Sequence, residues 1–143
     1  MNKIIFILIG SILLSQVFAD DDHDWFPENP TTIQDECEKL NPLTDESKAA
    51  LIKGTVHERP DFIGYMICTA KGMNFYTTEK GFDTDRLLYV LEKMNRLHNR
   101  NAVAECVKKH KDVKLEYTMV YNVAKCMKEV NKKEESVETE NSI

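Results

Sequence analysis

Four cysteines constrain the fold of this 143-residue chain more than any other feature: Cys37, Cys68, Cys106 and Cys126. They are separated by 30, 37 and 19 residues. No Cys-x-x-Cys pair and no cysteine–histidine pair stands at ligand spacing, so we expect no metal site. In an oxidising compartment, an even number of cysteines in a chain this short indicates disulfides. Four cysteines allow three pairings, and the compartment decides whether they pair at all.

The first 19 residues predict that the chain is exported. A positive charge at Lys3 is followed by an apolar run from Ile4 to Leu14, and small residues precede the acidic run that begins at Asp20. This pattern is typical of a cleaved secretory signal peptide, and the apolar run is shorter than the ~20 residues of a membrane span. We therefore expect residues 1–19 to be a signal peptide, the product to be secreted and extracellular, and no stretch to insert stably in a membrane.

Composition favours a single domain. The chain is 42% hydrophobic and 30% charged, with only 5 Gly and 4 Pro, which suits one globular unit. Its net charge of −5 provides no general basic face, so nucleic acid is not an expected partner. We expect a helical domain at residues 20–131, beginning with a loose acidic arm at residues 20–30. Residues 132–143 are predicted to form a flexible acidic tail.

Hydrophobic periodicity between these ends predicts an all-α fold. The short connections imply that successive helices pack against each other. The last predicted helix is apolar around most of its circumference and should lie at the centre of the bundle. The six predicted helices cover residues 32–40, 45–53, 60–73, 84–97, 100–110 and 114–130. Their boundaries rest on a capping box of Thr31 with Gln34, N-caps at Thr44 and Asp83, a first-turn Pro60 and a closing Gly54.

The cysteine spacing, the export signal and the six helices together resemble the insect odorant-binding proteins of the pheromone-binding/general-odorant type. The common pattern of that family has six cysteines. Here Gly64, four residues before Cys68, and Tyr117, nine residues before Cys126, stand in place of the second and fifth. Those two cysteines bond to each other in the family, so their joint loss leaves no orphan thiol. The chain is therefore similar to the four-cysteine, or minus-C, subgroup.

The resemblance leads to two predictions about packing. We predict the disulfides Cys37–Cys68 and Cys106–Cys126. We also expect Gly64 to leave a notch in its helix and the ring of Tyr117 to fill that notch.

The resemblance also implies a compact bundle of six short helices around a central apolar cavity. Such a protein would be a carrier of small hydrophobic molecules, such as odorants or pheromones, and not an enzyme. It would need no cofactor, and its partners would be a small hydrophobic ligand and, as a further candidate, an odorant receptor. The expected ligand-binding residues are Met66, Ala70, Phe75, Tyr76, Leu88, Leu91, Val103, Tyr121, Val123 and Met127.

Purely structural interpretations of these residues stay open. Any single methionine can be ordinary core, and Tyr76 and Tyr121 can make structural hydrogen bonds instead of contacting a ligand. The histidines are more simply solvated groups than a pH switch. No common hydrolase, metalloprotease or nucleotide-binding motif is present. The alternative function is a secreted helical cytokine or hormone without a cavity, although such proteins use fewer and longer helices.

Overall fold

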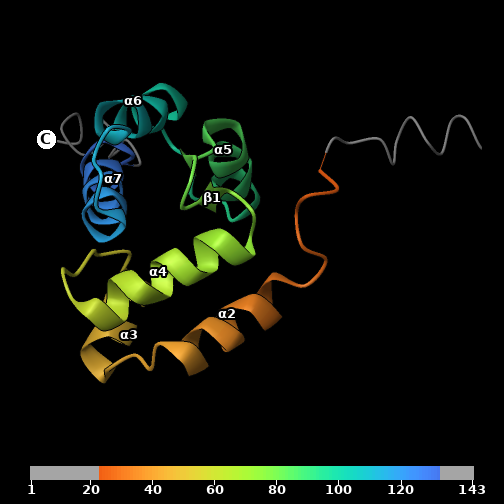
Figure 1. Ribbon diagram of the computed structural model, residues 1–143, viewed down its shortest axis with the longest axis vertical. Coiled ribbons are helices and arrows are strands. Elements are labelled where there is room, and N and C mark those ends of the chain that lie inside the picture. Colours follow the sequence, from red (N-terminus) through yellow and green to blue (C-terminus); the bar gives the residue numbers. More distant parts are fainter. Residues whose placement is uncertain (1–22, 133–143) are drawn as a thin grey trace, which may run out of the picture.

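The computed structural model describes residues 23–132. The predicted signal peptide at residues 1–19 and residues 133–143 of the predicted tail lie outside this range. Within it the fold is a bundle of six helices with one short antiparallel hairpin, which confirms the all-α prediction (Figure 1). The helices are α2 (Pro30–Leu40), α3 (Asp45–Lys53), α4 (Pro60–Gly72), α5 (Thr84–Lys93), α6 (Arg100–His110) and α7 (Glu116–Val130), and the hairpin joins β1 (Tyr76–Thr77) to β2 (Gly81–Phe82).

Most helix boundaries follow the predicted start and stop signals. The side chains of Thr44 and Asp83 each accept a hydrogen bond of 3.1 Å from the backbone N–H three residues later. Pro60 is the first residue of α4, where its missing N–H has no helical partner to lose. Gly54 ends α3 in the left-handed region, with a φ of 71°. Local chemistry alone thus places these ends.

Two boundary predictions are wrong. The first helix begins at Pro30 with Asn29 as its N-cap, and no side chain caps it. Thr31 is already inside the helix, so it forms no capping box with Gln34. The helix predicted for residues 84–97 ends at Lys93, because Asn95 adopts a left-handed φ of 58° that terminates it.

The arm before α2 is docked where the structure describes it. The ring of His23 stacks on Tyr89 of α5, with 3.8 Å between ring centroids. The rings of Trp25 and Phe26 lie 5.3 and 5.5 Å from the same tyrosine, and the Arg86 guanidinium lies 4.9 Å from the Trp25 ring. The expectation of a loose arm is therefore wrong for this segment, because its aromatic side chains find an apolar surface on α5.

Both predicted disulfides are present. Cys37–Cys68 joins α2 to α4, and Cys106–Cys126 joins α6 to α7. Each covalent link therefore connects two helices that also pack against each other, and α2 and α4 lie side by side at one end of the bundle (Figure 1).

The glycines of α4 face α2 on either side of the first disulfide. A Cβ at Gly64 would meet the side chain of Asn41, with Cγ at 3.2 Å, and a Cβ at Gly72 would meet Ile33. The pairs 41–64, 37–68 and 33–72 run in opposite directions, so the two helices are antiparallel. Asn41, and not Tyr117, fills the notch at Gly64, and that packing prediction is wrong.

The core consists of two clusters that share α7. Val120 belongs to the cluster around Phe62 and Ile63 of α4, and Val123 to the cluster of α5 and α6 that includes Val103. These valines are each 1% exposed. The helix predicted to be central thus contributes to both clusters. Phe75, Phe82 and Met119 pack against both clusters at once.

Candidate functional site

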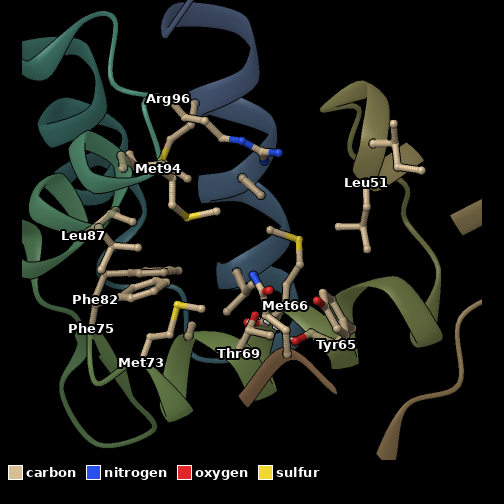
Figure 2. Close-up of a pocket in the computed structure, with 18 residues that line it drawn as sticks. Leu51, Tyr65, Met66, Thr69, Met73, Phe75, Phe82, Leu87, Met94 and Arg96 are labelled. Atoms are coloured by element: carbon tan, nitrogen blue, oxygen red, sulfur yellow. Dashed lines mark hydrogen bonds between the residues drawn. The ribbon is translucent and has the colours of Figure 1, made fainter. Parts of the chain in front are cut away.

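A cavity of about 380 Å³ lies between α4, α5 and α7, with α3 on the side away from α5 (Figure 2). This volume is in the range of small-molecule sites. Of the 18 residues that line it, all but four carry apolar side chains. The apolar residues are Leu51, Ile52, Met66, Ala70, Met73, Phe75, Phe82, Leu87, Val90, Leu91, Met94, Val120, Ala124 and Met127.

Methionines come to the cavity from several directions. Met66 lies on α4, Met73 and Met94 are the C-caps of α4 and α5, and Met127 lies on α7. Unbranched thioether side chains change rotamer easily and present a polarizable surface. The cavity wall can therefore adjust its shape to small molecules of different shapes.

The four polar lining residues are Gln34, Tyr65, Thr69 and Arg96. The hydroxyl of Thr69 donates to the carbonyl oxygens of Tyr65 and Met66, both at 3.0 Å, so its proton is engaged within α4. Burial, reinforced by the carboxylates of nearby acids, raises the pKa of Tyr65 above its ordinary value. Its phenol, like that of an ordinary tyrosine, is a neutral hydrogen-bond donor at neutral pH.

The structure brings half of the predicted ligand-binding residues to this cavity. Met66, Ala70, Phe75, Leu91 and Met127 line it. Their positions near the cysteines and on the inner faces of α4, α5 and α7 bring them together. Whether they contact a ligand stays a prediction.

The other half lie outside the wall. Leu88, Val103 and Val123 are buried in the cluster formed by α5, α6 and α7. Tyr121 packs against the α4 cluster. The sequence register placed each of these residues on the correct helix. It could not tell which apolar face meets a neighbouring helix and which meets the void.

Tyr76 also lies outside this cavity and has a structural partner. It is 3% exposed and lies beside the carboxylate of Glu116. Lys71 holds that carboxylate at 2.9 Å and Thr78 donates to it at 3.1 Å. Burial, together with the charge of Glu116, raises the pKa of Tyr76 to about 12. The hydrogen bond from Thr78 ties the hairpin to the start of α7, beside the Tyr76 ring.

Thirteen of the 18 lining residues were not among the predicted ligand-binding residues, and the most informative omissions are one wall and one charge. The wall is formed by Leu51 and Ile52 of α3, and Ile52 is 83% exposed at the edge of the cavity. The available signal in the sequence was an apolar pair, Leu51 and Ile52, at the end of a helix shortly before Gly54. The charge is that of Arg96, and nothing in the sequence distinguishes this arginine from the other solvated cations.

No cluster of metal-binding side chains occurs within residues 23–132. The helices of that part of the chain are also too short or too polar to cross a bilayer.

The model of the PBP/GOBP family, the pheromone-binding and general-odorant-binding proteins, matches residues 20–130. No curated protein matches the sequence significantly. The matched region contains all four cysteines, and their two disulfides fit the minus-C pattern. The chain therefore belongs to the PBP/GOBP family, with the all-helical, two-disulfide architecture of its four-cysteine members.

Proposed function

We propose that this protein is a secreted carrier that holds small hydrophobic molecules, such as odorants or pheromones, in the cavity between α4, α5 and α7. Residues 1–19 would direct its export, and residues 132–143 would form a solvated tail. An odorant receptor remains a candidate partner.

The apolar cavity is the single observation that carries the proposal. Transfer of apolar surface from water is worth roughly 25 cal/mol per Å², so an apolar guest gains free energy by occupying this space. The few polar groups on the wall would orient the guest. Membership of a family of binding proteins supports the same conclusion. A secreted cytokine or hormone, the alternative function, has no use for such a space.

A fluorescence experiment tests carriage directly. The folded, oxidised protein is titrated with an apolar naphthylamine dye, whose emission rises in an apolar environment, and the dye is then displaced with decanol. We expect saturable uptake and complete displacement. A folded protein that takes up no dye would contradict the proposal and favour the interaction protein.

A matched pair of variants locates the site. Ala124 lines the cavity and is 4% exposed, so Ala124→Leu should fill part of it. Ala104 lies on α6, partly buried and outside the cavity wall. We expect Ala124→Leu to weaken dye binding by about tenfold, which corresponds to about 1.4 kcal/mol, and Ala104→Leu to leave it unchanged. Equal effects of the two variants would place dye binding elsewhere.

A further inference from the structure

Arg96 is the one charged residue among those that line the cavity. We propose that its guanidinium anchors the carboxylate of an amphiphilic ligand, so that the cavity favours fatty carboxylates of medium length over uncharged molecules of the same shape. This inference rests on the proposed carrier function and names the ligand class for the same site.

The position of Arg96 suits such an anchor. Figure 2 shows its guanidinium extending over the cavity beside Met94, while Tyr65 and Thr69 lie at the opposite end of the view. Between the two ends the wall is apolar, with Met66 facing the space from α4. A ligand with one charged end and an alkyl chain matches this distribution of polar and apolar surface.

Hydrogen bonds hold both the backbone N–H and the backbone carbonyl of Arg96 in place. Asn95 adopts a φ of 58° after the end of α5 and donates its N–H to the carbonyl of Glu92 at 3.0 Å. The N–H of Arg96 donates to the carbonyl of Leu91 at 2.8 Å, which completes a Schellman motif. The carbonyl of Arg96 accepts a hydrogen bond of 2.7 Å from Nδ2 of Asn131.

Asn131, the C-cap of α7, clamps this loop more widely. Its Oδ1 accepts hydrogen bonds from the backbone N–H groups of His98 and Asn99, at 2.7 and 2.8 Å. One side chain thus joins the segment that carries Arg96 to the end of α7, one turn beyond Met127 of the cavity wall. Because the backbone is held in advance, less entropy is lost when the guanidinium binds a ligand.

The guanidinium of Arg96 has no acidic partner among the described residues, 23–132. Glu92, one turn earlier on α5, is paired with Arg100 at 3.0 Å. A guanidinium offers a planar set of five N–H donors that fits a carboxylate with two parallel hydrogen bonds. An alcohol of the same chain length can use neither the charge nor that geometry fully.

The test compares decanoate with decanol in displacing the naphthylamine dye, at neutral pH and low salt. A charge-assisted hydrogen bond is stronger than a neutral one, but Arg96 is exposed, so solvent and salt screen its charge. We therefore expect Arg96→Gln to weaken decanoate binding by about tenfold and to change decanol binding by less than about twofold. Added salt should weaken decanoate binding to the wild type more than to the variant.

Two further variants serve as controls. Lys93→Gln removes a cation from the last turn of α5, where the ammonium lies 5.8 Å from the ring of Tyr89 and outside the cavity wall; it should leave decanoate binding unchanged. Arg96→Lys keeps the charge and should retain part of the preference. Because the fold uses the backbone and not the side chain of Arg96, the thermal midpoints of both Arg96 variants should match the wild type.

Three results would overturn the proposed anchor. Equal binding of decanoate to the wild type and to Arg96→Gln would overturn the anchor while leaving carriage of apolar molecules intact. An equal loss with Lys93→Gln would mean that only the general charge of the protein matters, which also overturns it. If the wild type takes up no dye at all, both the anchor and the proposed function fail.

Discussion

Replacing Gly72 by alanine tests the close packing of α2 against α4. A Cβ at this position would overlap with Cγ2 of Ile33 and lie 3.7 Å from its Cβ. Isoleucine in a helix has one strongly preferred χ1 rotamer, so the methyl group cannot easily turn away. The Cys37–Cys68 disulfide, one turn from each residue, also limits how far the helices can separate.

The size of the effect follows from two opposing contributions. Overpacking of a close contact costs about 1–3 kcal/mol. Alanine improves helix propensity by at most about 1 kcal/mol, and by less at the last residue of a helix such as Gly72. We therefore expect Gly72→Ala to lower the free energy of unfolding by about 1–2 kcal/mol, which would lower the thermal midpoint by about 4 °C or more.

Urea unfolding of the oxidised protein, followed by circular dichroism, measures this change. Gly64→Ala is the matched control, because its Cβ would meet only the end of the Asn41 side chain. That side chain can rotate and would lose a long hydrogen bond of 3.3 Å to the Cys37 carbonyl. We expect Gly64→Ala to cost less than about 1 kcal/mol, since alanine favours the middle of a helix. The reasoning is refuted if Gly72→Ala is as stable as the wild type or loses less stability than Gly64→Ala.

Three further predictions concern pH and covalent links. Burial, helped by a nearby carboxylate, raises the folded pKa of Tyr76 to about 12, above the unfolded value of about 10. The free energy of unfolding should therefore fall as pH rises between these two values. The urea midpoint of Tyr76→Phe should vary less over that range than the midpoint of the wild type. A hydrogen bond from Ser47, with further backbone hydrogen bonds, lowers the pKa of Asp61. Its carboxylate therefore stabilises the fold above the unfolded pKa of about 4, and this stabilisation is lost as pH falls through the folded pKa. We expect Asp61→Asn to be less stable than the wild type at neutral pH. On acid titration, its free energy of unfolding should fall less than that of the wild type. Replacing Cys106 and Cys126 together by serine opens a link across a sequence separation of 20 and should lower the free energy of unfolding in urea by about 3 kcal/mol; an unchanged midpoint would mean that the bond contributes nothing.

Much of the secondary structure follows from local chemistry. Thr44, Gly54, Pro60 and Asp83 act on the backbone within a few residues of themselves, so their effect is readable from the sequence. The prediction failed beyond residue 93, where Asn95 took the left-handed conformation that glycine usually adopts. Asparagine populates that region less often, and the sequence pattern alone did not indicate that it would here.

The cysteine intervals also carried information over long distances. Together with the helical pattern they indicated the family, and the family implied the pairing that the structure has. The same register brought Met66 and Met127 to the cavity wall but failed for Val103 and Val123. All four lie on the predicted helices, so identifying the helix was not enough to identify the wall.

The sequence by itself determined the number and order of the helices and the family, and the family implied the two disulfides. Only the tertiary structure decided that Gly64 faces Asn41, that α3 closes one side of the cavity, and that Arg96 lies over it. The physical reason is that a cavity is the space left between helices after they pack. Its wall depends on crossing geometry and side-chain contacts across the whole chain, whereas a helix depends on residues within a turn or two of each other.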